Sequence, residues 1–231
     1  MAVHLEFYKQ LIAELKQKNV TLIAVSKTKS VEAIKELYEL GQRDFGENYV
    51  QELVEKQAQL PGDIRWHFIG HLQSNKVKLI APFISLIHSV DSEKLLKEIN
   101  KQAIKNNRVI DCLLQVYIAK EETKFGLNEE ELNSTIESIN QKDAKSEKLF
   151  KNICIKGLMG MASFTDDKKT IRNEFGVLKN LFEKYASLPS SNFQLSYLSM
   201  GMSADYKMAI EEGSNMVRIG SLLFGERHYN Q

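Results

Sequence analysis

The run LIAVSK at residues 22–27 sets the fold of this chain, because four apolar residues in succession are typical of a buried strand. The run turns polar at Ser26 and stops on Lys27, which is followed by Thr28 and Lys29. A lysine at a strand end that is partly desolvated can lose its proton and form a Schiff base with an aldehyde. The alternative interpretation is an ordinary solvated lysine at the end of a strand.

The run MVRIGS at residues 216–221 lies near the other end of the chain and has a similar pattern. Gly220 allows a backbone to approach a ligand closely, and successive N–H groups at a strand-to-helix turn bind phosphate. Lys27 and this predicted cradle can serve one small ligand only if the first and last strands are neighbours. A closed barrel makes them neighbours.

Length and composition are compatible with such a barrel. The 231 residues suit one (β/α)8 barrel, and 43% hydrophobic with 26% charged residues is an ordinary globular balance. A net charge of +1 gives no electrostatic reason to expect nucleic acid or an acidic membrane as a partner. We find no signal peptide or membrane-spanning run, and expect Cys112 and Cys154 to be buried free thiols in a reducing compartment. These features predict a cytoplasmic protein.

Strand-like and helix-like patterns alternate along the chain, and no segment resembles a linker. Helices are expected before the first strand and at 31–40, 50–57, 75–81 and 204–212. Further helices are expected after a cap at Asp91 or Ser92, after Asn128 or the acidic cluster that follows it, and from 165 to about 185. The expected strands are 21–27, 43–45, 65–69, 86–90, 109–118, 153–159, 194–199 and 216–219. This alternation predicts an α/β protein, with residues 1–231 forming a single parallel (β/α)8 TIM barrel. The alternative architecture is an open, doubly wound sheet.

The carboxyl ends of the strands are where a barrel carries its chemistry. Glycine and small polar residues concentrate after the last two expected strands, at 201–203 and 220–221, where barrels commonly place a phosphate. The other strand ends carry Lys27, residues 46–48, His67, residues 70–71, 89–91, 120–124 and 160–163.

Seven motifs in the same order give the chain a resemblance to a known family. They are AVSKT at 24–28, FGENYVQE at 45–52, WHFIGHLQSNK at 66–76, KFGL at 124–127, GLM at 157–159, LSMGMS at 198–203 and MVRIGS at 216–221. The chain resembles the pyridoxal phosphate homeostasis protein family over about residues 20–229. That family has a fold similar to the N-terminal barrel domain of alanine racemase.

The resemblance implies a role for each matching residue. Lys27 is expected to form the Schiff base with pyridoxal 5'-phosphate, as an N6-pyridoxal phosphate lysine. Arg218 is expected to face the pyridine nitrogen, and Asn48 to line the other edge of the ring. The phosphate is expected to be held by Ser203, Gly220 and Ser221, with the backbone of Met202.

Arg218 affects what such a site can do. Arginine can only donate hydrogen bonds, so a ring nitrogen facing it is unprotonated and a poorer electron sink. Racemases of similar fold take their second base from an added domain, whereas this chain ends about ten residues after the cradle. We therefore expect a monomeric carrier that maintains intracellular pyridoxal phosphate and delivers it to apo-enzymes, rather than an enzyme. The alternative for Arg218 is an interior residue paired with a carboxylate.

Two other functions stay open at this stage. A racemase or lyase with weak activity needs a second acid or base, for which His67 and His71, expected near the mouth, and Tyr206 are the candidates. An aldolase could use Lys27 without pyridoxal phosphate, but that leaves Arg218 unexplained. Lys124 is either a second amine for the cofactor or a solvated loop residue. The spacing of His67 and His71 does not suit a helical zinc pair, and no metal site is expected.

Overall fold

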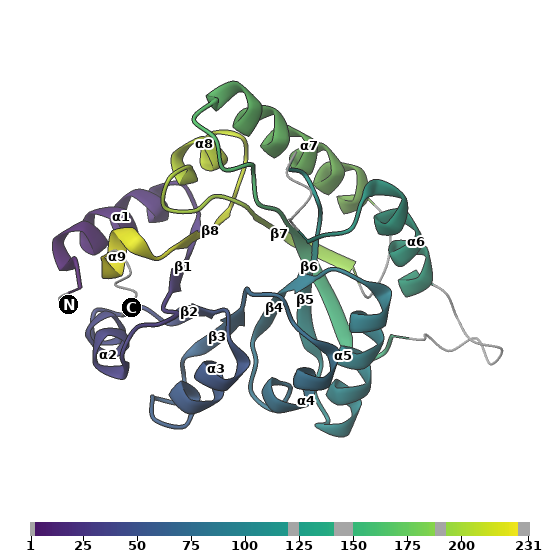
Figure 1. Ribbon diagram of the computed structural model, residues 1–231, viewed down its shortest axis with the longest axis horizontal. Helices are drawn as coiled ribbons and strands as arrows, with labels where there is room; N and C mark the ends of the chain where they lie inside the picture. Colours follow the sequence, from purple (N-terminus) through teal and green to yellow (C-terminus); the bar gives the residue numbers. More distant parts are fainter. Residues whose placement is uncertain (1–2, 120–124, 141–149, 188–192, 226–231) are drawn as a thin grey trace.

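Eight parallel strands close into a barrel in the computed structural model, which describes residues 3–119, 125–140, 150–187 and 193–225 (Figure 1). The strands follow one another around the barrel in chain order, and β8 pairs with β1. They are β1 (Thr21–Val25), β2 (Asp44–Glu47), β3 (Arg65–Phe68), β4 (Leu86–Val90), β5 (Ile110–Gln115), β6 (Ile153–Met159), β7 (Phe193–Ser199) and β8 (Met216–Ile219). This confirms the closed barrel and excludes the open sheet.

Helices surround the barrel on its outside, as Figure 1 shows. In the described part of the chain they are α1 (Leu5–Gln17), α2 (Val31–Glu39), α3 (Val50–Gln57), α4 (Val77–Ile80), α5 (Glu93–Lys105), α6 (Glu129–Asn140), α7 (Lys168–Ala186), α8 (Tyr206–Glu211) and α9 (Ser221–Phe224), with a 3-10 turn at Ser74–Lys76. None of these helices is both long and apolar enough to cross a bilayer.

Side chains at the helix starts confirm the expected caps. Ser92 Oγ accepts a hydrogen bond from the backbone N–H of Leu95, and Asp167 caps α7. At α6, Asn128 Oδ1 accepts from the backbone N–H of Glu131, whose carboxylate accepts from the N–H of Asn128. Each cap satisfies a backbone donor that the first helical turn leaves unpaired.

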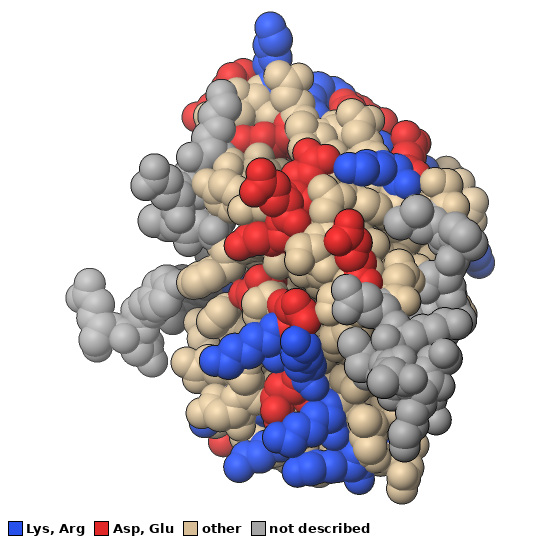
Figure 2. Space-filling view, turned by 90° about the vertical axis from the view of Figure 1, so that its right-hand side faces the viewer, with Lys and Arg blue, Asp and Glu red and all other residues tan. Residues whose placement is uncertain are grey.

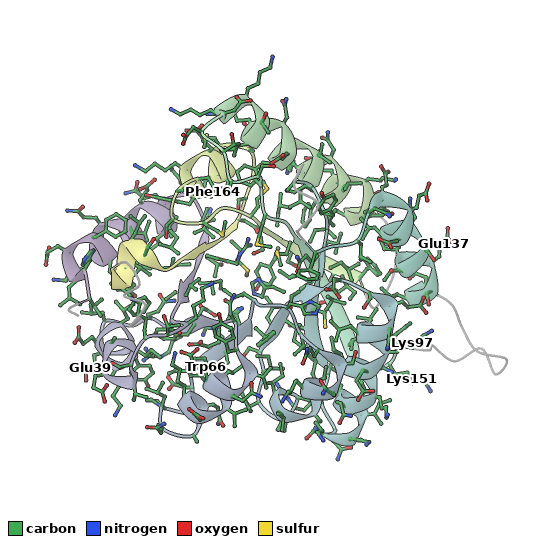
Figure 3. All side chains as sticks on the ribbon, viewed as in Figure 1. Glu39, Trp66, Lys97, Glu137, Lys151 and Phe164 are labelled. Atoms are coloured by element: carbon green, nitrogen blue, oxygen red, sulfur yellow. The ribbon has the colours of Figure 1, made fainter. Side chains whose placement is uncertain are left out.

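β1, β4 and β8 are buried on both faces, which explains their largely apolar sequences, whereas β7 exposes Gln194 and Ser196. Outward-facing residues such as Trp66 pack against the helices, and a small apolar cluster occupies part of the interior: Ile23, Leu86, Leu113, Met159 and Met216. Figure 3 shows Lys97 and Glu137 on the outer surface, and the face in Figure 2 carries both acidic and basic side chains. Cys112 and Cys154 are buried free thiols, as expected.

The first strand is shorter than the sequence predicts. β1 ends at Val25, so Ser26 and Lys27 lie in the loop that leads to α2. The backbone turns there because Thr28 adopts a left-handed conformation with φ of 63°. β2 in turn runs further than predicted, through Gly46 and Glu47, and β5 ends earlier, at Gln115. Lys27 therefore projects from a loop above the barrel.

Lys56 on α3 forms a buried ion-pair network at the rim beside β1 and β2. Its side chain is only 6% exposed, and its Nζ donates to Glu47 Oε1 at 2.8 Å and Glu52 Oε1 at 2.6 Å. The same Nζ donates to the backbone oxygen of Ser26 at 2.7 Å. Burial raises the pKa of Glu47, although the charge of Lys56 opposes that effect. One ammonium group thus satisfies two carboxylates and a backbone carbonyl.

The network holds the backbone on both sides of Lys27. On one side, Lys56 binds the carbonyl of Ser26. On the other side, the backbone N–H of Thr28 donates to Glu52 Oε1 at 2.6 Å. A positive φ is disfavoured for a β-branched residue, so the contact with Glu52 stabilises a turn that Thr28 would not adopt alone.

We predict that Lys56→Met lowers the free energy of unfolding by about 3–5 kcal/mol, because it leaves buried Glu47 without its counter-charge. The matched control is Lys9→Met, which removes an ion pair with Glu6 on the exposed side of α1. That change should cost less than about 1 kcal/mol. Urea denaturation of the three proteins measures both values, and equal losses in the two variants would contradict the prediction.

Candidate functional site

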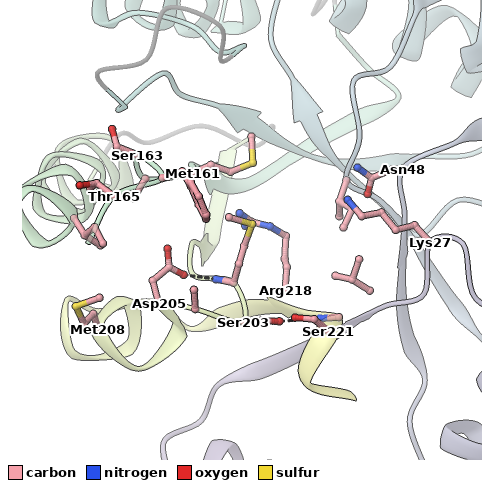
Figure 4. A pocket seen from close by; sticks show the side chains of 18 of the residues that line it. Lys27, Asn48, Met161, Ser163, Thr165, Ser203, Asp205, Met208, Arg218 and Ser221 are labelled. Carbon is pink, nitrogen blue, oxygen red and sulfur yellow. Dashed lines mark hydrogen bonds between the residues drawn. The ribbon is translucent and has the colours of Figure 1, made fainter. Parts of the chain in front are cut away.

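A cavity of about 740 Å³ lies at the carboxyl ends of the strands (Figure 4). Residues from both ends of the chain line it, together with the loop that follows β6. The lining includes every residue that the sequence assigned to the cofactor: Lys27, Asn48, Met202, Ser203, Arg218, Gly220 and Ser221. Their separation in sequence is removed by the closure of the barrel, since β1 and β8 are hydrogen-bonded neighbours.

Lys27 and Asn48 lie on one side of the cavity in Figure 4, and Arg218, Ser203 and Ser221 lie between them and the loop after β6. Lys27 is half-buried, in the loop held by the Lys56 network. The loop that carries the Lys27 amine is therefore held at the cavity by the Lys56 network and not by strand pairing.

Asn48 follows β2 and offers an unused acceptor. Its Oδ1 is buried and accepts no hydrogen bond from any described residue. The backbone of Gly70 passes so close that a Cβ there would lie 2.4 Å from the carbonyl oxygen of Asn48. Glycine at position 70 thus allows Asn48 to occupy the cavity wall. A buried acceptor without a partner costs stability, so this oxygen fits a role in holding a ligand.

Arg218 is buried in the barrel beneath the cavity, with only 4% of its surface exposed. Its Nη1 donates to the backbone oxygen and the hydroxyl of Ser199 at 2.9 and 2.7 Å, and Nη2 donates to the carbonyl of Gly160 at 3.0 Å. These described acceptors are neutral oxygens, so the alternative of a direct carboxylate pair does not hold for the described residues. Burial lowers the pKa of Arg218 to about 10, and the charge of Asp205 opposes that shift.

Three of the five N–H bonds of Arg218 are used in these contacts. The Nε–H and one Nη2–H donate to no described residue, although the guanidinium lines the cavity. Arg218 can therefore still donate to an acceptor atom inside the cavity.

The other end of the cavity is built from the loop after β7 and the start of α9. The backbone N–H of Gly220 donates to Ser203 Oγ at 3.3 Å, which joins the two segments. Gly201 has φ of +95°, a conformation that favours glycine, and it turns the chain out of β7. Ser221 begins α9, whose first backbone N–H groups have no acceptor within the helix.

The backbone N–H of Met202 has a partner that the sequence did not reveal. It donates to Asp205 Oδ1 at 2.6 Å, so an anion that used this amide would compete with Asp205. The role of Lys29 at the cavity was also missed. Lys29 donates to the carbonyls of Phe224 and Gly225 at 3.0 and 3.2 Å, and thereby joins the first loop to α9.

The loop after β6 forms the remaining wall, and Glu174 on α7 anchors it. The hydroxyl and the backbone N–H of Ser163 both donate to the buried carboxylate of Glu174, at 2.7 Å each. Phe164, labelled in Figure 3, follows with 94% of its surface exposed. The sequence marked residues 160–163 as a strand end but gave no signal for Glu174, which is distant along the chain.

The expected position of His67 near the mouth is wrong. His67 points into the barrel, where its Nε2 lies 3.0 Å from Asp44 Oδ1 and its Nδ1 lies 2.9 Å from His88 Nε2. The alternation of β3 places Trp66 and Phe68 outside, so His67 must face inward. His71 lies outside the cavity, 3.1 Å from Asp91.

Other candidates also lie away from the cavity. Tyr206 is buried on α8 and does not line it. Lys124 falls outside the described residues. Within the described ranges, no group of three or more His, Cys, Asp or Glu side chains is placed to hold a metal ion.

Comparison with known proteins places the barrel and its cavity in a family. The family described as alanine racemase, N-terminal domain, matches residues 5–228. The pyridoxal phosphate homeostasis protein of Aquifex aeolicus is 42% identical over 209 residues, which cover 90% of this chain and 87% of the relative.

Two solved structures are also similar. PipY of Synechococcus elongatus, with pyridoxal phosphate bound, is 34% identical with a TM-score of 0.80, over 93% of this chain and 98% of PipY. Alanine racemase of Bartonella henselae shares the fold at 17% identity and a TM-score of 0.70, and the match covers 99% of this chain but 62% of the racemase. The chain therefore belongs to the pyridoxal phosphate homeostasis protein family, within the wider family of the alanine racemase N-terminal domain.

Proposed function

We propose that this protein binds pyridoxal 5'-phosphate through Lys27 and maintains the intracellular supply of the cofactor. The observation that carries this proposal is that seven residues, expected from motifs at both ends of the chain, line one cavity. Relatives named pyridoxal phosphate homeostasis protein and the PipY structure with the cofactor bound support the same ligand.

The cavity fits the chemistry of this ligand. When bound, pyridoxal phosphate supplies an aldehyde that combines reversibly with amines, and we propose that Lys27 provides the amine. We propose that Arg218 donates one of its remaining N–H groups to the ring nitrogen, and that Asn48 uses its unpartnered Oδ1 at the other edge. Ser203, Gly220 and Ser221 are proposed to bind the phosphate, together with Met202 if its amide exchanges Asp205 for the anion.

A carrier fits this site better than a racemase. Because Arg218 can only donate, it favours an unprotonated ring nitrogen, which withdraws electrons weakly. A racemase also needs a second acid or base, and none of the three side chains considered for it, His67, His71 and Tyr206, lines the cavity. We propose that residues 1–231 act as one barrel domain, as a cytoplasmic monomer that delivers the cofactor to apo-enzymes.

We predict that Lys27→Ala abolishes the visible absorption band of the protein after incubation with pyridoxal phosphate and removal of the free ligand. Lys29→Ala is the matched control, because Lys29 is the other lysine in the first loop and also lines the cavity. It should keep the band. Borohydride reduction followed by peptide mass spectrometry identifies the modified lysine, and a band that survives in Lys27→Ala would sink the proposed attachment site.

A separate prediction concerns the proposed binding of the phosphate by Ser203 and Ser221. Ser203→Ala and Ser221→Ala should each weaken binding of pyridoxal phosphate about 10- to 100-fold, because a hydrogen bond to a charged group is lost. Binding of pyridoxal, which lacks the phosphate, should stay unchanged. Titrations of both ligands by absorbance test this, and an equal loss for both would show that the serines act on the fold instead.

Delivery is tested by mixing the loaded protein with a pyridoxal phosphate-dependent enzyme stripped of its cofactor. We expect enzyme activity to appear while the visible band of the carrier declines. Free alanine supplied to the loaded protein should keep its optical activity, because none of His67, His71 and Tyr206 lines the cavity as a second acid or base. Catalytic racemisation of alanine, without recovery of the stripped enzyme, would instead favour the racemase alternative.

A further inference from the structure

A chain of hydrogen bonds crosses the barrel interior beneath the cavity. It begins at Arg218 on β8, whose Nη1 donates to Ser199 Oγ on β7 at 2.7 Å. Ser199 Oγ lies 3.3 Å from Nδ1 of His88 on β4, and Nε2 of that histidine lies 2.9 Å from Nδ1 of His67 on β3. Nε2 of His67 lies 3.0 Å from Asp44 Oδ1 on β2. We call these five residues the interior chain.

The interior chain connects the cavity to the opposite end of the barrel. Ser199 and His88 are fully buried, and His67 is 4% exposed. Asp44 begins β2, at the amino-terminal end of the strands, and binds Arg65 through two hydrogen bonds. The side chain of Arg65 is 57% exposed, so the chain ends in an ion pair at the surface.

When both imidazoles are neutral, the two ends of the interior chain fix the direction of every hydrogen bond in it. Arg218 can only donate, and the carboxylate of Asp44 can only accept. His67 therefore donates from Nε2–H to Asp44 and accepts at Nδ1. His88 must then donate from Nε2–H to His67 and accept at Nδ1, so the proton of the Ser199 hydroxyl points to His88. Ser199 Oγ keeps its lone pairs for Arg218.

Burial and nearby charges keep His88 neutral and Asp44 ionised. Burial holds the pKa of His88 well below its usual range, and the nearby His67 and Arg218 lower it further. Contacts with His67 and Arg65 hold the pKa of Asp44 at about 2, although burial opposes them. Asp44 thus remains a carboxylate at any pH near neutrality, and His88 takes no charge.

We propose that Asp44, His67, His88 and Ser199 are positioning residues, which orient the Arg218 guanidinium toward the cavity through a one-way hydrogen-bond chain set by Asp44. In a reversed chain Nδ1–H of His88 would donate to Ser199 Oγ and occupy one of the two lone pairs that are otherwise open to Arg218. The direction of the chain is a property of the protein alone. Its effect on the ring nitrogen rests on the proposed function.

The direction is tested first without cofactor, by nitrogen-15 NMR of the histidine side chains. We expect His67 and His88 to be neutral and protonated at Nε2. Asp44→Asn keeps the shape of the side chain but lets it donate as well as accept, so a population with protonated Nδ1 should appear. Arg65→Gln is the matched control, since it breaks the same ion pair but keeps the carboxylate. An Nδ1-protonated His88 in the unmodified protein would overturn the proposal.

The effect on the site is tested with two ligands, pyridoxal phosphate and its 1-deaza analogue, which has carbon in place of the ring nitrogen. Asp44→Asn and Ser199→Ala should bind pyridoxal phosphate about fivefold more weakly, the typical effect of one net hydrogen bond. Arg65→Gln should bind normally, and all proteins should bind the analogue alike. Equal losses for both ligands would mean that the interior chain only supports the fold.

The two experiments separate this proposal from the proposed function. Ser199→Ala should keep the Nε2-protonated histidines, because Asp44 still sets the direction, while it weakens binding. If no protein binds pyridoxal phosphate but the NMR result holds, the proposed function fails and the one-way chain stands. If the unmodified protein binds the ligand and Asp44→Asn leaves both its tautomers and its affinity unchanged, the positioning role is wrong.

Discussion

Pairing between the first and last strands is the constraint on which the site depends. The parallel register joins Thr21 to Met216 and Ala24 to Ile219, so the carboxyl ends of β1 and β8 lie side by side at the same rim. Only this closure brings Lys27 to the segment of Gly220 and Ser221. An open sheet with the same elements would separate the amine from the predicted phosphate cradle. Closure also leaves no unpaired strand edge.

Two buried cations at this rim are stabilised in different ways. Lys56 is surrounded by two carboxylates and a carbonyl, so its charge is compensated and it serves as a fixed support for the Lys27 loop. Arg218 instead contacts carbonyls and a hydroxyl, which orient the guanidinium without neutralising it. A paired arginine would present less positive charge to a ligand. The fold thus separates a structural cation from one that remains available to the cavity.

The polar interior of the barrel explains why Arg218 tolerates burial. Barrels of this kind usually fill the interior with apolar layers, and here the cluster around Ile23 and Met159 does so only in part. The two histidines and Ser199 occupy the remaining space and give Arg218 a hydrogen-bonded neighbour. Burial lowers the pKa of His88, so the imidazole nearest to Ser199 stays neutral and adds no charge beside the guanidinium.

The sequence by itself determined the alternation of strands and helices and the helix caps, and its motifs pointed to seven residues that line one cavity. The alternation depends on local periodicity, and the caps depend on side chains next to the backbone that they cap. The seven residues depend on motifs shared with the family. Tertiary structure alone decided that β1 stops before Lys27, that His67 faces the barrel interior and that Met202 binds Asp205. These features arise from strand register and from contacts between distant segments. The local sequence does not indicate which acceptor a neighbouring strand or loop will place opposite a given donor.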